Sequence, residues 1–180
     1  MMLAAEGLRV SLVTIHLPLS QAPAEITQAR VLHTARVTAE ALVRDFGIPR
    51  PRLAVAALNP HAGESGDIGR EEIEQIAPAV AVLQSEGLDV KGPLPADSLF
   101  AKAVRDGFDA VVCMYHDQAL IPIKMLDFWG GVNISLGLPI VRTSPDHGTA
   151  FDIAGKGQAR PDSFIAALRM AREIAARRLA

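Results

Sequence analysis

The chain has 180 residues, of which 49% are hydrophobic and 21% charged. This ordinary globular composition excludes an intrinsically disordered protein. Lys and Arg total 18 and Asp and Glu total 20, which gives a formal net charge of −2 without a long run of one sign, so a nucleic-acid-binding surface is not predicted. The single cysteine, Cys113, excludes an internal disulfide framework and indicates a reducing compartment, which we expect to be the cytoplasm.

The sequence predicts neither a signal peptide nor a membrane span. Residues 1–7 lack a basic start, and Glu6 interrupts their short apolar run. The longest apolar runs, such as residues 53–58 and 76–83, fall well short of the roughly 18 residues that a span needs. We therefore expect a soluble protein.

Short apolar runs typical of strands alternate with helical periodicity along the chain. Strands are predicted at residues 8–15, 52–58, 109–115, 132–136 and 140–143. Helices are predicted at residues 26–46, 71–86, 98–105 and from about residue 161 to the end. Pro78 should kink or split the second helix. The alternation predicts an α/β fold with a mostly parallel sheet and helices on both faces.

Histidines follow three of the predicted strands: His16, His61 and His116. Because the carboxyl ends of parallel strands share one edge, where ligand sites collect, these imidazoles could meet there and hold a divalent cation. Asp97 and Asp117 could add oxygen ligands. The alternative is that each histidine is an ordinary loop residue, because the spacing contains no His-x-His or His-Glu-x-x-His motif.

Three glycines, Gly63, Gly66 and Gly69, recur at three-residue steps before the second predicted helix. They could form an anion-binding loop at the helix N-terminus, or simply a tight turn with positive φ. No G-x-G-x-x-G motif follows a strand, so a Rossmann dinucleotide site is not predicted.

Polar residues interrupt three apolar segments in the second half of the chain: Lys124, Asn133 and Arg142. Lys and Arg together suit a phosphate group, the lysine as a point charge and the arginine as a fork. The alternative is surface exposure or an internal salt bridge to one of three nearby carboxylates: Asp117, Asp127 or Asp146.

Five segments, in order, resemble the 4-hydroxythreonine-4-phosphate dehydrogenases of pyridoxal 5′-phosphate biosynthesis: TIHLPL, NPHAGESGDIGREE, GPLPADSLF, MYHDQALIPIK and GVNISLGLPIVRTSPDHGTAFDIAGKG. The resemblance covers nearly the whole chain. It implies an isocitrate/isopropylmalate dehydrogenase-like fold that lacks the family's N-terminal part. Residues 1–180 would then be the metal- and NAD-binding C-terminal portion of a two-domain dehydrogenase. The first half, which supplies a substrate-contacting His-Thr pair, would be absent.

The resemblance also implies a reaction, a metal and an assembly. The C3 hydroxyl of 4-phosphooxy-L-threonine would be oxidised by NAD, and loss of CO₂ would give 3-amino-2-oxopropyl phosphate. The metal ligands map onto His16, His61 and His116, in a homodimer whose site lies at the subunit interface and takes one histidine from the partner chain. Imidazole ligands favour Zn²⁺, with Co²⁺ similar and oxygen-preferring Mg²⁺ a poorer match.

Further residues fall on the family's site positions. Lys124, Asn133 and Arg142 map onto substrate-binding positions, where Lys124 is a phosphate ligand or a proton donor, and Asp97 maps onto a catalytic carboxylate. Trp129 is unusual, and either alters the pocket near Asn133 or packs on the surface.

Residues 147–156 resemble the adenosine-binding loop of isocitrate and isopropylmalate dehydrogenases, which implies that His147, Gly148 and Asp152 bind the cofactor. Asp152 would accept a hydrogen bond from the adenosine ribose and repel a 2′-phosphate, favouring NAD over NADP. The alternative is a helix-entry turn.

Two other functions remain open at this point. A paralogue of the same fold would oxidise 4-phospho-D-threonate or 4-phospho-D-erythronate and share the metal and phosphate motifs. A non-catalytic dimeric module would bind metal or nucleotide without turnover.

Overall fold

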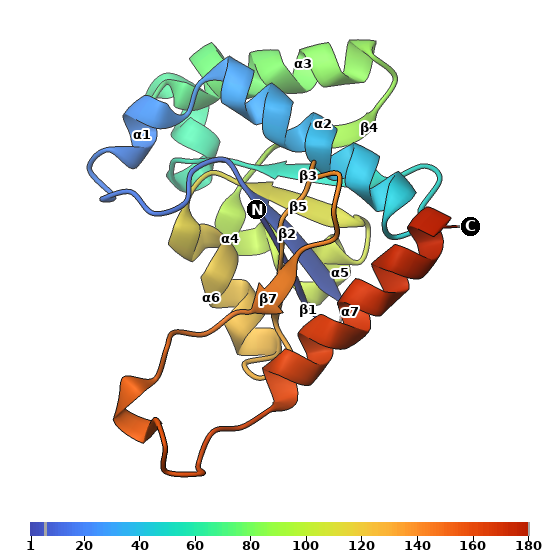
Figure 1. The fold of residues 1–180 in the computed structure, drawn as a ribbon. Coiled ribbons are helices and arrows are strands. Elements are labelled where there is room, and N and C mark those ends of the chain that lie inside the picture. Colours follow the sequence, from blue (N-terminus) through green and yellow to red (C-terminus); the bar gives the residue numbers. More distant parts are fainter. Residues whose placement is uncertain (6, 180) are drawn as a thin grey trace.

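The computed structural model describes residues 1–5 and 7–179, and all of their side chains except that of Ala103. Within these residues the strands form one seven-stranded sheet with the order β4-β3-β5-β2-β1-β6-β7 (Figure 1). The strands in chain order are β1 (Met2–Ala5), β2 (Leu8–Leu12), β3 (Arg52–Ala56), β4 (Asp89–Leu94), β5 (Ala110–Cys113), β6 (Val132–Ile134) and β7 (Thr143–Pro145).

The sheet has a parallel half and an antiparallel half. Strands β4, β3, β5 and β2 pair in parallel. Strand β1 is antiparallel to both β2 and β6, and β7 is antiparallel to β6. Strand β6 therefore runs in the direction of β2, so that five of the seven strands point one way. The predicted α/β fold with a mostly parallel sheet is confirmed.

Helices cover both faces of this sheet (Figure 1). They are α1 (Ala22–Glu25), α2 (Gln28–Arg44), α3 (Ala77–Ser85), α4 (Ala96–Leu99), α5 (Lys102–Arg105), α6 (His116–Leu126) and α7 (Asp162–Leu179), with short turns η1 (Pro60–Gly66), η2 (Glu72–Ile76) and η3 (Phe151–Ile153). Helices α2 and α3 lie over one face and α4 and α6 over the other, while α7 packs against β6 and β7. No helix in the described part is long and apolar enough to cross a membrane.

Each face of the sheet has its own hydrophobic core. On β5, Val112 belongs to the core under α2 and α3, whereas its neighbour Val111 belongs to the core under α4 and α6. Successive side chains on a strand point to opposite faces, so a strand covered on both sides must be apolar throughout. This explains why β3 and β5 were recognisable as nearly continuous apolar runs.

The structure corrects several element predictions. The helix predicted at residues 71–86 is split into η2 and α3, with Pro78 in the first turn of α3, as expected. The helix predicted at residues 98–105 is instead two short helices, because the backbone of Ala101 is extended (φ −59°, ψ 136°). The last predicted strand, residues 140–143, lies later, at β7. Strands β1 and β4 and helix α6 were missed, since Pro93 and Pro122 made β4 and α6 poor candidates.

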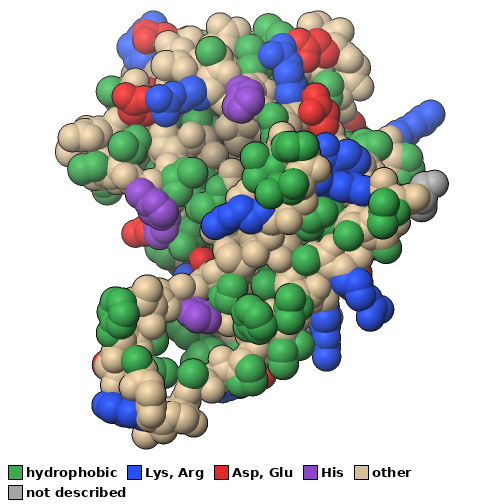
Figure 2. Space-filling view, in the orientation of Figure 1, with side chains coloured by type: hydrophobic (Ala, Val, Ile, Leu, Met, Phe, Trp, Pro, Cys, Tyr) green, Lys and Arg blue, Asp and Glu red, His purple; other side chains and the backbone are tan. Residues whose placement is uncertain are grey.

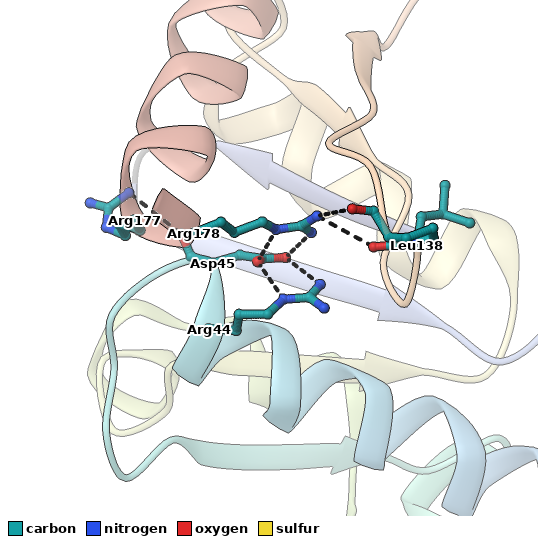
Figure 3. Close-up of polar contacts among 6 residues, drawn as sticks. Arg44, Asp45, Leu138, Arg177 and Arg178 are labelled. Atoms are coloured by element: carbon teal, nitrogen blue, oxygen red, sulfur yellow. Dashed lines mark hydrogen bonds and ion pairs between the residues drawn. The ribbon is translucent and has the colours of Figure 1, made fainter. Parts of the chain in front are cut away.

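A buried carboxylate joins three distant segments (Figure 3). Asp45, just after α2, has a side chain only 1% exposed and accepts two hydrogen bonds from Arg178 of α7, at 2.7 and 2.8 Å. Arg178 also donates to the carbonyls of Leu138 and Pro139, in the loop between β6 and β7. Burial alone would raise the pKa of Asp45, but the hydrogen bonds from Arg178 and Arg44 outweigh it and lower the pKa to about 2.

Candidate metal and substrate site

His16 and His116 lie together beyond the carboxyl ends of β2 and β5. Main-chain pairing continues past these strands, because Val13 N–H donates to the Cys113 carbonyl at 2.9 Å and Thr14 N–H to that of Met114 at 3.1 Å. The imidazole centroids of His16 and His116 are 5.7 Å apart. Both rings line a hollow of about 310 Å³. The adjacent parallel strands thus bring together two of the three predicted ligands.

The orientation of His116 is fixed by its neighbours at the start of α6. Its Nδ1 is 2.6 Å from Oδ1 of Asp117. An ionised carboxylate can only accept, so in the neutral imidazole this contact assigns the proton to Nδ1 and leaves the Nε2 lone pair free. Buried Gln118 accepts from Met114 N–H at 2.7 Å and donates to the Ala57 carbonyl at 2.7 Å. Gln118 therefore fastens the first turn of α6 to the ends of β5 and β3.

His61 lies in a left-handed turn after β3. The backbone has positive φ at six consecutive residues, His61 (52°), Ala62 (54°), Gly63 (77°), Glu64 (43°), Ser65 (59°) and Gly66 (104°). Four of these are not glycine, and a left-handed conformation costs such residues about 1–2 kcal/mol each. A turn of this kind persists only where its surroundings hold it.

The carboxylate of Glu72, a residue only 2% exposed, stabilises this turn. Its Oε1 accepts from the N–H groups of Leu58 and Asn59, at 2.8 and 2.7 Å, and its Oε2 accepts from Nδ2 of Asn59 at 2.9 Å. A Cβ at Gly63 would lie 2.7 Å from Glu72 Oε2, and one at Gly69 would collide with the Asn59 side chain. These glycines permit close packing in a tight turn, which favours the second of the two interpretations offered by the sequence.

The three histidines do not form a complete metal site within one chain. Among the described residues no three His, Cys, Asp or Glu side chains converge closely enough to hold a cation. His16 and His116 form a pair, and His61 lies outside it on the next loop. The pair itself fits a metal such as zinc, because both rings face one hollow and His116 presents a free nitrogen.

Lys124 lies two turns along α6 from His116, and both side chains line a second hollow of about 440 Å³ that also includes Asp117. Nζ of Lys124 donates to the carbonyl of Asp146 at 3.0 Å and lies 3.6 Å from its Oδ2. The internal salt bridge that the sequence left open is therefore present, and a phosphate bound here would compete with Asp146.

The other predicted substrate residues occupy separate positions. Asn133, on β6, donates to Met1 Sδ at 3.2 Å, and its buried Oδ1 has no partner within the described residues. Arg142 is exposed and donates to Ser135 Oγ at 2.9 Å across the β6–β7 loop. Asp97 is exposed on α4, which packs against η1 and hence beside the turn of His61.

The predicted cofactor residues lie on a loop that protrudes from the body of the molecule (Figure 2). His147 and Gly148 line a hollow of about 660 Å³ together with Trp129 and Arg160, whereas Asp152 is exposed on η3 outside it. The guanidinium of Arg160 lies 4.1 Å from the centroid of the Trp129 ring. Trp129 therefore lines the hollow under the loop of residues 147–160.

The positioning residues Thr14, Asn59, Glu72 and Gln118 were not identified from the sequence. Thr14 Oγ1 donates to the Met114 carbonyl at 2.7 Å and ties the His16 loop to the end of β5. Their positions next to the histidine motifs were the only available signal. Polar residues of these types are mostly exposed in proteins, so proximity in sequence alone could not identify these four as buried supports.

The fold and this polar sheet edge define an α/β protein with its candidate site at the carboxyl ends of parallel strands. A family model described as pyridoxal phosphate biosynthetic protein PdxA matches residues 1–171. The chain belongs to this family.

Relatives named 4-hydroxythreonine-4-phosphate dehydrogenase are similar over almost the whole chain. The protein of Caulobacter vibrioides is 66% identical over 99% of the chain and 54% of its own length, and that of Maricaulis maris 63% identical over 97% and 52%. The chain thus spans about half the length of the curated relatives it matches. These relatives are dehydrogenases by name, which places the family among the oxidoreductases.

Solved structures agree on the fold. The 4-hydroxythreonine-4-phosphate dehydrogenase of Klebsiella pneumoniae has a TM-score of 0.87 and 46% identity, over 97% of this chain and 53% of the other. A terephthalate 1,2-cis-dihydrodiol dehydrogenase of Burkholderia xenovorans has a TM-score of 0.78 and 35% identity, over 96% and 54%. The same fold therefore occurs in dehydrogenases named for different substrates.

Proposed function

We propose that the chain is the metal- and NAD-binding portion of a dehydrogenase that oxidises 4-hydroxy-L-threonine phosphate and decarboxylates the product to 3-amino-2-oxopropyl phosphate. The observation that carries the proposal is the His16–His116 pair, 5.7 Å between centroids, at the carboxyl edge of β2 and β5. The names of the relatives supply the substrate class.

The histidines would hold a divalent cation, most suitably zinc, with His61 as the third protein ligand and one of the three supplied by a second subunit. When bound, the cation would stabilise negative charge on substrate oxygens and NAD would accept the hydride. The proton on Nδ1 of His116 is held by Asp117, which keeps Nε2 available as a ligand.

Lys124 and Arg142 would bind the substrate phosphate, and Asn133 would use its unpartnered Oδ1 toward the same substrate. As a phosphate ligand, Lys124 must give up its hydrogen bond to the Asp146 carbonyl and donate to the phosphate instead. As a proton donor, it would release a proton toward the substrate. His147, Gly148 and Asp152 would bind the adenosine part of NAD. We place this enzyme in the cytoplasm as a homodimer.

A second candidate is favoured by the Burkholderia xenovorans structure, whose name specifies a different substrate at 35% identity. A related enzyme acting on 4-phospho-D-threonate or 4-phospho-D-erythronate would use the same residues. A module that binds metal without turnover is the third candidate, because the chain spans only about half of its relatives.

A hydride-transfer assay distinguishes these functions. NADH formation is followed with Zn²⁺, NAD and each of the three phosphorylated substrates, for the 180-residue chain and for the chain joined to the first half of a relative. Turnover with 4-hydroxy-L-threonine phosphate supports the proposal. Turnover only with another substrate selects the paralogue, and zinc binding without turnover in either form selects the module.

A further inference from the structure

The turn that carries His61 is supported through its backbone rather than through the histidine side chain. Within the described residues the exposed His61 ring makes no hydrogen bond, so the backbone of the turn decides where the imidazole points. That backbone is left-handed at residues that disfavour it.

The buried carboxylate of Glu72 contacts the chain on both sides of His61. It accepts hydrogen bonds from the N–H groups of Leu58 and Asn59, three and two residues before His61, where the chain leaves β3. It also packs against Gly63, two residues after His61. Asn59 extends this contact by donating to Glu71 at 2.7 Å and to Glu72 at 2.9 Å.

We propose that Glu72 is a positioning residue for the metal ligand His61, and that Asn59 assists it. This inference rests on the proposed function, in which His61 binds a cation. A carboxylate with three donors fixed on it cannot shift without losing all of them, so it sets the direction of the turn before any cation arrives. Glu72 would never touch the cation, since its oxygens are occupied inside the protein.

The decisive variant is Glu72→Gln, which keeps one acceptor oxygen for the two N–H groups but places an amide donor against Nδ2 of Asn59. Loss of a group that hydrogen-bonds a metal ligand directly lowers metal affinity by about tenfold to hundredfold, and Glu72 acts one step further away, through the backbone before His61. We expect Zn²⁺ affinity, measured by calorimetry on the 180-residue chain, to fall by about tenfold in Glu72→Gln. The matched control is Glu74→Gln on the same turn η2, whose carboxylate pairs with Arg70 at the surface.

Co²⁺ serves as a spectroscopic probe that a merely stabilising residue would not affect. The visible absorption bands of bound Co²⁺ should change in Glu72→Gln and stay unchanged in Glu74→Gln, because the bands report ligand geometry. If Glu72→Gln does not fold by circular dichroism, Asn59→Ala replaces it. That variant removes only the side-chain donor, and it should weaken Zn²⁺ binding in the same direction.

The outcomes separate this inference from the proposed function. A wild-type chain that binds no Zn²⁺ overturns the metal assignment and, with it, the positioning role. A wild-type chain that binds Zn²⁺, with unchanged affinity and unchanged Co²⁺ bands in the folded Glu72 or Asn59 variant, overturns the positioning role alone.

Discussion

The turn of His61 and the loop of residues 147–160 both contain left-handed residues, yet the protein supports them differently. The turn is fastened from inside by Glu72, a buried carboxylate with three hydrogen bonds. The loop is largely exposed. Its left-handed non-glycine residue is Ala150, whose carbonyl accepts a hydrogen bond from the N–H of Ile153. Its side-chain contacts lie at the surface, where the guanidinium of Arg160 packs on the Trp129 ring and pairs with the exposed carboxylate of Asp162.

A third segment, the β6–β7 loop that carries Arg142, follows the pattern of the turn. Arg178 holds the carbonyls of Leu138 and Pro139, and Asp45 holds Arg178 (Figure 3). The segments that carry the proposed metal ligand His61 and the proposed phosphate ligand Arg142 are held by interior carboxylates, whereas the proposed cofactor loop depends on weak surface contacts. Substitutions should therefore have large effects at the first kind of segment and small effects at the second.

The largest expected effect follows from Asp45→Ala. Removing one partner of a buried ion pair typically costs 3–5 kcal/mol, because the other charge stays buried without compensation. We expect the free energy of unfolding to fall by about 3 kcal/mol or more, as measured by urea denaturation. The control is Asp106→Ala, whose exposed pair with Lys102 should contribute at most about 1 kcal/mol. Equal losses in the two variants would contradict the interior role of Asp45.

Replacing His61 by alanine tests the function of the anchored turn. Loss of one of three proposed ligands should weaken Zn²⁺ binding by at least about 100-fold, which corresponds to about 3 kcal/mol. Elemental analysis after dialysis would then find little zinc in His61→Ala. The control His33→Ala changes an exposed histidine of α2 and should keep wild-type zinc content. Unchanged zinc in His61→Ala would remove this residue from the site.

Lowering the pH should destabilise the protein by protonating Asp45, whose carboxylate holds Arg178 against the β6–β7 loop. Its pKa is about 2 in the folded protein, below the ordinary value of 3.8. A lowered folded pKa gives stability that is present above the unfolded value, so it is lost as pH falls from about 4 through about 2. At about 1.4 kcal/mol per pKa unit the loss is roughly 2 kcal/mol. Urea midpoints across this pH range measure it, and Asp45→Asn should flatten the part due to this residue.

Much of the fold was predictable because burial leaves a clear pattern in the sequence. Strands β3 and β5 are apolar on both faces, β2 has the apolar residues Leu8, Val10 and Leu12 on one face, and α2 repeats its apolar residues at helical spacing. The positions of His16 and His116 followed from parallel topology alone, since adjacent strands end at one edge. Helix α6 was missed because Pro122 stands in its middle.

The supports of the site were not predictable in the same way. A left-handed turn at His61 leaves little trace in sequence, because three of the residues after it are ordinary L-residues with positive φ. Glu72 and Asp45 look like surface carboxylates until tertiary structure brings their donors to them. Among the described residues His61 does not join the His16–His116 pair in a metal-binding group, and no local sequence pattern encodes this separation.

The smallest expected effect concerns the exposed loop. Trp129 is the single tryptophan of the chain, so its fluorescence reports on the hollow beside His147 and Gly148. Binding of NAD there should quench this fluorescence, and titration gives the affinity. A cation–π contact at an exposed site is worth about 0.5–1 kcal/mol, so Arg160→Ala should weaken NAD binding only about two- to fivefold. Arg169→Ala, on the exposed side of α7 and outside the hollow, should change nothing. A loss of a hundredfold in Arg160→Ala would show that this loop is anchored as firmly as the His61 turn, and the contrast between the two segments would no longer hold.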